Sequence, residues 1–204
     1  MSANSILTQE QQEALQEIAN IGMGQAGASI AQLLDHFVIL SIPKIVTMQP
    51  DNVAAALLRT VGPGNISAVR QAFHSILRGE AVVIFGEQRC NDLADLMGYE
   101  SVVDHIGELE LLLDVSNILV GACLGGIAEQ LKSDIGFSAP SLMVDRVPVE
   151  AMLRADDVSW SNALLVEVNF RLEGRSFACH LVILMPEAEI RALAPAGDVC
   201  RADR

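Results

Sequence analysis

The feature that most constrains this chain is an internal repeat with an offset of 97 residues. The pair Asn20-Ile21 returns as Asn117-Ile118, and other identities follow at the same offset without a gap: Gly24 with Gly121, Ile30 with Ile127, Ala31 with Ala128, Leu34 with Leu131 and Pro43 with Pro140. Neither half by itself is expected to cover the β-sheet that its own strands would form. The repeat therefore predicts one fused domain over residues 1–204, made of two repeats at about 8–99 and 105–195.

Each half shows the same order of elements: a long helix, an apolar strand after the proline, a hairpin and a short helix. The long helices are predicted at Thr8–His36 and His105–Ser133, and the hairpin turns at Arg78-Gly79-Glu80 and Glu173-Gly174-Arg175. The short closing helices are predicted at Asn91–Met97 and Glu187–Leu193. The strands are predicted at Lys44–Met48, Ile66–Leu77, Ala81–Phe85, Ser141–Val149, Asn162–Leu172 and Phe177–Met185. This order predicts an α+β fold with pseudo-twofold symmetry.

Composition narrows the classes of partner. The formal net charge is −13, which disfavours binding to the phosphate backbone of nucleic acid. The four cysteines form no pair with metal-ligand spacing, and no metal site is expected. The first residues lack the apolar core of a signal peptide, and the stretch 18–34 is too polar for a membrane span. A cytoplasmic protein without membrane insertion is expected.

The two long helices carry matching polar stripes. The first stripe has steps of four, three and four residues: Glu13, Glu17, Asn20 and Gly24. The second has the same steps: Glu110, Asp114, Asn117 and Gly121. Such a stripe on one helix is usually only a solvated face, and duplication alone would preserve its spacing. A glycine inside a helix costs roughly 1 kcal/mol relative to alanine, and close backbone packing or partner docking would explain Gly24 and Gly121.

These residues resemble the signature of the CheC, CheX and FliY phosphatases, which runs Asp or Ser, three residues, Glu, two residues, Asn, twenty-two residues, Pro. Glu17, Asn20 and Pro43 match it with every spacing kept, and Glu13 stands where the family has Asp or Ser. The second copy keeps Asn117 and Pro140, has Asp114 in place of Glu and has Glu110 at the first position. The resemblance implies a duplicated CheC-like fold, with an antiparallel sheet and two long helices.

The resemblance also implies an activity: hydrolysis of the aspartyl-phosphate of a CheY-like response regulator, in chemotaxis or another two-component pathway. The enzyme would have no cofactor of its own, and Mg²⁺ would belong to the regulator. Asn20 would orient the attacking water, and Glu17 would pair with the regulator's active-site lysine. Asp114 and Asn117 would form a second site that is active, weak or vestigial, so the first site is favoured. Glu13, Gly24, Glu110 and Gly121 would flank the sites.

A second class of function stays open. The chain could be a non-catalytic module that binds a response regulator or a CheD-type deamidase, as related flagellar-switch proteins share the fold without the sites. The altered first position, Glu13 and Glu110, and the substitution at Asp114 favour this alternative, and the intact Glu17/Asn20 pair favours the enzyme. The CheX relatives dimerise, whereas a complete internal repeat favours a monomer.

Overall fold

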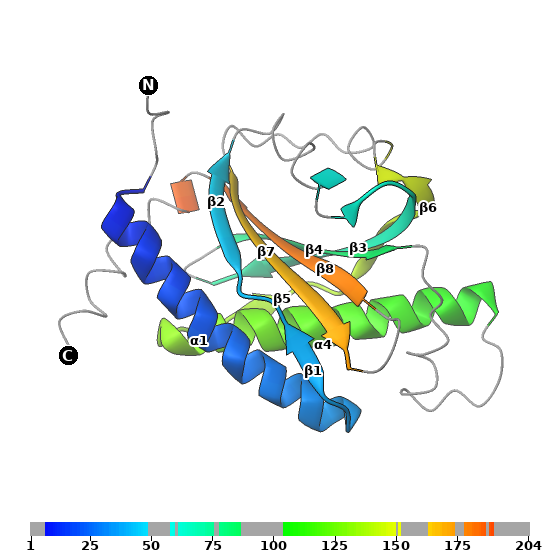
Figure 1. The fold of residues 1–204 in the computed structure, drawn as a ribbon, viewed down its shortest axis with the longest axis horizontal. Coiled ribbons are helices and arrows are strands. Elements are labelled where there is room, and N and C mark those ends of the chain that lie inside the picture. The colour runs from blue at the N-terminus through cyan, green and yellow to red at the C-terminus, as the bar shows by residue number, and fades with distance from the viewer. Residues whose placement is uncertain are drawn as a thin grey trace.

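The computed structural model describes residues 7–48, 58–59, 61–75, 78–86, 104–149, 151, 163–173, 178–186 and 188–189. Within them, two long helices lie along one side of an antiparallel β-sheet (Figure 1). The predicted α+β class, the antiparallel sheet and the two long helices are confirmed. The internal duplication, the pseudo-twofold axis and the boundaries of the two repeats remain predictions.

The first helix, α1, spans Gln9–Leu34 and begins with a capping box. The Thr8 hydroxyl accepts a hydrogen bond from the Gln11 amide at 3.2 Å, and the Thr8 amide donates to Oε1 of Gln11 at 3.0 Å. Leu15, Ile18 and Ile30 are buried. Ile21 is 42% exposed, because the buried face of α1 also runs through Ala19, Met23 and Ala26.

The second long helix, α4, spans His105–Gln130 and is capped by Asp104, whose Oδ1 accepts from the Gly107 amide at 2.9 Å. Among the described residues it is the one helix long and apolar enough to cross a membrane, by length and composition alone. More than half of its most apolar window is buried inside the molecule, against α1 and the sheet. The apolar character of α4 is therefore that of a core helix.

The eight described strands form one sheet: β1 Val38–Leu40, β2 Lys44–Met48, β3 Asn65–His74, β4 Arg78–Gly86, β5 Gly136–Phe137, β6 Ser141–Pro148, β7 Ala163–Leu172 and β8 Ala178–Pro186. The central order is β7-β8-β4-β3. Strands β1 and β2 both pair with β7, whereas β5 and β6 both pair with β3. The first strands of each half thus add to the hairpin of the other half, so neither half forms its sheet alone.

The β3–β4 hairpin corrects one predicted turn. Gly79 was expected in a tight turn, but β4 already begins at Arg78 and Gly79 pairs with Phe73. A Cβ at position 79 would collide with the backbone carbonyl of Leu184 in β8 and with the Phe73 ring. The glycine is therefore explained by close packing inside the sheet rather than by a left-handed turn.

Two apolar layers lie on the two faces of the sheet. The larger one packs α1 and α4 against inward-facing residues of the sheet such as Val69, Val83 and Ile183. The smaller one lies on the opposite face around Ile66, Ile84 and Val182. The face that carries the helices therefore holds most of the core and positions the two polar stripes.

The helices cross at glycines other than the predicted ones. A Cβ on Gly22 would lie 2.8 Å from the Ile127 amide nitrogen and 2.9 Å from the carbonyl carbon of Gly126. A Cβ on Gly24 or Gly121 would meet nothing within 4 Å. Close packing of the two helices therefore explains Gly22 and Gly126. As an explanation of Gly24 and Gly121, close backbone packing is wrong.

The short helix predicted at Asn91–Met97 and the turn glycine Gly174 lie outside the described residues. Only Ala188 and Glu189 of the helix predicted at Glu187–Leu193 are described, and both are helical.

Candidate functional site

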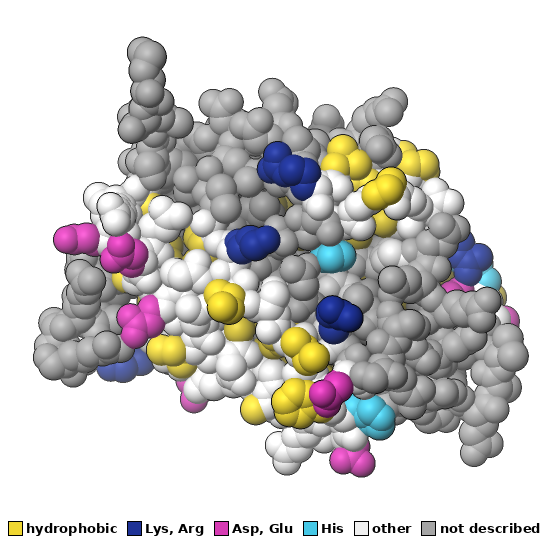
Figure 2. Space-filling model, in the orientation of Figure 1, with side chains coloured by type: hydrophobic (Ala, Val, Ile, Leu, Met, Phe, Trp, Pro, Cys, Tyr) yellow, Lys and Arg dark blue, Asp and Glu magenta, His cyan; other side chains and the backbone are white. Residues whose placement is uncertain are grey.

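The first polar stripe lies on the outer surface of α1. Glu13, Glu17 and Asn20 are all exposed, and the next position, Gly24, faces open space. Figure 2 shows acidic side chains gathered over the N-terminal half of α1. The stripe therefore presents two carboxylates, one amide and a bare stretch of helix backbone to an approaching partner.

Gln16 fixes the Asn20 side chain. Its Nε2 donates to Oδ1 of Asn20 at 3.2 Å and to the main-chain oxygen of Pro43 at 2.6 Å. Pro43 is buried in the loop between β1 and β2. The signature asparagine and the signature proline, 23 positions apart in sequence, are thus joined through one glutamine.

The second stripe has the same exposure on α4. Glu110, Asp114 and Asn117 are exposed, and Gly121 has open space where its Cβ would be. The two stripes therefore share exposure as well as spacing.

Gln71 fixes the Asn117 side chain. Its Nε2 donates to Oδ1 of Asn117 at 2.9 Å and to the main-chain oxygen of Ser138 at 2.8 Å. Ser138 lies two residues before Pro140 in the loop between β5 and β6. The Ser138 amide in turn donates to the Ala72 carbonyl at 2.9 Å, which holds this loop against β3.

Sequence reasoning missed both glutamines. Gln16 stands four residues before Asn20, the spacing at which helix side chains meet. Gln71 stands between Val69 and Phe73 on the inward-facing positions of β3, and it is only 2% exposed. A polar side chain at an apolar position of an alternating strand was the signal available in the sequence.

Two other features do not provide a reactive centre. Cys123 and Cys179 are fully buried, and burial raises the pKa of the Cys123 thiol to about 12 and that of Cys179 well above its usual value. Both thiols therefore stay protonated at neutral pH. Among the described residues, no group of three or more His, Cys, Asp and Glu side chains could hold a metal ion.

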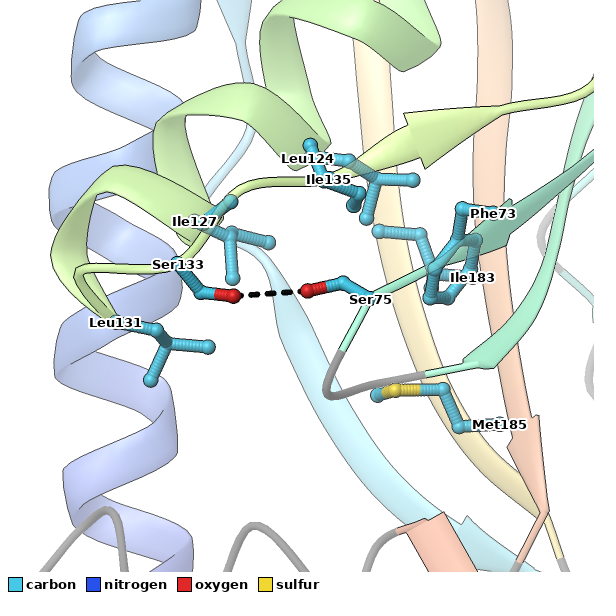
Figure 3. Close-up of a pocket in the computed structure, with 10 residues that line it drawn as sticks. Phe73, Ser75, Leu124, Ile127, Leu131, Ser133, Ile135, Ile183 and Met185 are labelled. Atoms are coloured by element: carbon cyan, nitrogen blue, oxygen red, sulfur yellow. Dashed lines mark hydrogen bonds between the residues drawn. The ribbon is translucent and has the colours of Figure 1, made fainter.

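A small pocket lies beside the C-terminal end of α4 (Figure 3), and neither asparagine is among its described lining residues. The described residues that line it are apolar apart from Ser75 and Ser133, whose hydroxyl oxygens are 2.8 Å apart and hydrogen-bonded to each other. None of the described lining residues has a titratable side chain that could act as an acid or base in catalysis.

Comparison with known proteins shows which proteins this chain resembles. The model of the CheC-like family matches residues 10–41, which hold the whole first stripe and end two residues before Pro43. The predicted resemblance to the CheC-type family is confirmed. No curated protein sequence matches the chain significantly.

Solved structures show where else this CheC-like fold occurs. The structure of Thermotoga maritima FliY has a TM-score of 0.69 at 18% identity, with 95% of this chain and 98% of that chain covered. The middle domain of FliM from H. pylori has a TM-score of 0.63 at 12% identity, with coverage of 93% and 99%. The chemotaxis protein CheX from Desulfovibrio desulfuricans has a TM-score of 0.52 at 14% identity, with coverage of 82% and 99%. At such low identity these likenesses establish the fold.

Proposed function

We propose that this CheC-like chain is a cytoplasmic phosphatase that hydrolyses the aspartyl-phosphate of a CheY-like response regulator. The observation that supports it most is the exposed pair Glu17 and Asn20, one turn apart on α1, with the Asn20 amide held by a hydrogen bond. Phosphoryl transfer needs positioning and charge stabilisation more than it needs a nucleophile on the enzyme. A fixed amide beside a docking carboxylate meets that need.

The two side chains have different roles in this proposal. The Glu17 carboxylate pairs with the active-site lysine of the regulator and sets the depth and angle of docking. The Asn20 amide then reaches the phosphoryl group and orients a water molecule in line with the acyl-phosphate bond. Gly24 leaves the surface of the next helical turn clear for the regulator.

The chemical step is a hydrolysis. The water oxygen forms a bond to phosphorus while the bond between phosphorus and the aspartate oxygen breaks. The products are inorganic phosphate and a free aspartate carboxylate on the regulator, and the protons of water leave with the phosphate or pass to solvent. The regulator supplies its own Mg²⁺, which offsets the negative charge that the acidic stripe adds near the phosphoryl group.

The second site, Asp114 and Asn117, is a weaker copy in this proposal. Asp114 is exposed like Glu17 but one methylene shorter, so its carboxylate reaches less far toward the lysine of a docked regulator. Asn117 is held as firmly as Asn20, by Gln71. The difference between the sites therefore lies in docking rather than in the amide.

Apolar side chains beside the first site fit a protein substrate. Ile42, next to Pro43, is 75% exposed, and Ile21, next to Asn20, is 42% exposed. Figure 2 shows hydrophobic side chains open to solvent on this face of the molecule. Exposed aliphatic side chains that flank a polar site are typical of a surface that binds another protein.

The alternative is a non-catalytic module that binds a response regulator or a CheD-type deamidase. The residue that favours it is Asp114, which departs from the signature at the docking position of the second stripe. The same exposed stripes would then serve binding alone.

The two functions differ in what the asparagines do. Decay of a phosphorylated response regulator is measured with the wild type, Asn20→Ala and Asn117→Ala. The phosphatase proposal expects the wild type to speed decay and Asn20→Ala to lose most of that gain. Binding without any change in decay would favour the binding module, and loss of activity confined to Asn117→Ala would reverse the order of the sites.

A further inference from the structure

We infer that Gln16 and Gln71 are the positioning residues of the two sites, each of which fixes the polarity of its asparagine amide. This inference rests on the proposed phosphatase function. In both sites one Nε2 group donates to Oδ1 of the asparagine and to a main-chain carbonyl in the loop that holds the signature proline.

The main-chain carbonyls set the direction of these links. The oxygens of Pro43 and Ser138 can only accept hydrogen bonds, so the glutamine that faces each of them must present its NH₂ group. The second N–H of the same group then meets the asparagine, which must turn its Oδ1 toward it. The backbone carbonyl therefore fixes which end of the glutamine amide is the NH₂ group, and the glutamine in turn fixes which end of the asparagine amide is the oxygen. Without these partners, either amide could be turned by 180°.

These hydrogen bonds determine which atoms of each asparagine amide remain available for the reaction. One of the two lone pairs of Oδ1 is used, and no further hydrogen bond joins the Asn20 or Asn117 side chain to the described residues. One lone pair and both N–H groups of each asparagine are left for water and phosphoryl oxygens. A hydrogen bond accepted at Oδ1 also polarises the amide and strengthens its N–H groups as donors.

The two glutamines stand at positions that do not correspond to each other in the repeat. Duplication of one half therefore does not explain why both sites have a glutamine, and a shared need to hold the asparagine does. At the repeat offset, Gln16 corresponds to Leu113 and Gln71 corresponds to Val168, and neither of these can donate. The first site takes its glutamine from the same helix as the asparagine, and the second takes it from β3. Two different positions thus provide the same bonds.

Burial of Gln71 strengthens the case at the second site. The side chain is 2% exposed, and its Oε1 accepts no hydrogen bond from the described residues. An apolar residue would fill this position between Val69 and Phe73 without that desolvation cost. Gln71 therefore lowers the stability of the fold, and its presence is explained by the hydrogen bonds that its two N–H groups donate to Asn117 and Ser138.

The kinetic test isolates each site. In an Asn117→Ala background, Gln16→Met removes both donors and keeps an unbranched chain of similar length. We expect kcat to fall about tenfold, while the Kd for the regulator stays unchanged. Gln12→Met is the matched control, since Gln12 Nε2 donates to the Ile45 carbonyl at 3.2 Å one turn away and makes no described bond to Asn20.

The second site is tested in the Asn20→Ala background with Gln71→Met, for which we expect the same kcat loss. Ser67→Ala on the same strand is its control, because it removes the bond from the Ser67 hydroxyl to Asp145 at 2.7 Å. Gln16→Glu is a further variant, at a partly buried position of α1. Its carboxylate accepts instead of donating, so it reverses the Asn20 amide and should lower kcat at least as much as Gln16→Met.

An NMR readout keeps this test separate from the proposed function. The ¹⁵N–¹H₂ signals of the Asn20 and Asn117 carboxamides should shift in the corresponding Gln→Met variants and stay in place in the two controls. Unmoved signals, or unchanged kcat with an active wild type, would overturn the inference. A wild type that leaves regulator decay unchanged would remove the phosphatase proposal and the catalytic part of the inference, and the NMR signals would still decide whether the glutamines hold the asparagines.

Discussion

Gly22 of α1 lies against Gly126 of α4, so close that a Cβ on Gly22 would lie 2.9 Å from the carbonyl carbon of Gly126. The backbone of one helix meets the backbone of the other here, and no side chain fits between them. This crossing sets the relative positions of the two helices that carry the asparagines.

Alanine substitutions at two glycines of α1 that stand only two residues apart, on different faces of the helix, should therefore have opposite effects. Gly22→Ala forces the helices apart and should lower the free energy of unfolding by about 1–3 kcal/mol. Gly24→Ala meets open space and should raise it by about 1 kcal/mol, through helix propensity alone. Urea unfolding of the two variants measures both changes. Equal effects would contradict the assigned crossing.

Gly24 also offers a test of docking on the proposed site. Gly24→Leu adds bulk where the regulator is proposed to approach, without a clash inside the molecule. Its turnover of the phosphorylated regulator should fall several-fold while its unfolding midpoint stays at or above that of the wild type. Normal turnover would show that this turn of α1 lies outside the docking surface.

Ile42 should affect binding rather than chemistry. The side chain is 75% exposed, so Ile42→Ser should change the free energy of unfolding by less than about 0.5 kcal/mol. The Kd for the regulator should rise several-fold with kcat unchanged, the reverse of the pattern expected for Gln16→Met. A change in kcat with Kd unchanged would contradict this role.

Asp114→Glu tests why the second site is proposed to be weak. In an Asn20→Ala background it restores the signature residue at an exposed position, and turnover should rise several-fold. Asp114→Asn has the same size without the charge and should lower turnover. No gain from Asp114→Glu would mean that side-chain length does not limit this site.

The buried thiols predict a pH effect on stability. Burial raises the pKa of Cys123 from 9.0 to about 12, so the folded state holds its proton more tightly than the unfolded state does. The associated stability is complete below pH 9 and is lost as the pH rises toward 12. Urea unfolding at about pH 8 and about pH 11 should show a larger loss for the wild type than for Cys123→Ala. Parallel losses would contradict this assignment.

Much of the local structure could be predicted because it depends on neighbours in sequence. Thr8 and Gln11 are three residues apart and form the capping box by themselves, and the strand at Lys44–Met48 follows from its composition. The stripes were predicted because helix periodicity alone brings their members together.

The rest depends on contacts between distant segments. Nothing near Gly22 in sequence indicates that Gly126 will cross it, so the open positions Gly24 and Gly121 looked equally suited to packing. Gln71 is 46 residues from Asn117, and their bond follows only from the placement of α4 on β3. Gly79 looked like a turn residue because its contact with β8 comes from the far end of the chain.

The most direct measurement of the central claim compares the wild type with the Asn20→Ala, Asn117→Ala double variant on one phosphorylated response regulator. The rate of acyl-phosphate loss is followed, together with the Kd for the regulator bound to beryllofluoride as a phosphoryl mimic. The account predicts faster loss with the wild type, loss at the unassisted rate with the double variant, and a similar Kd for both. Equal rates with the two proteins would contradict it.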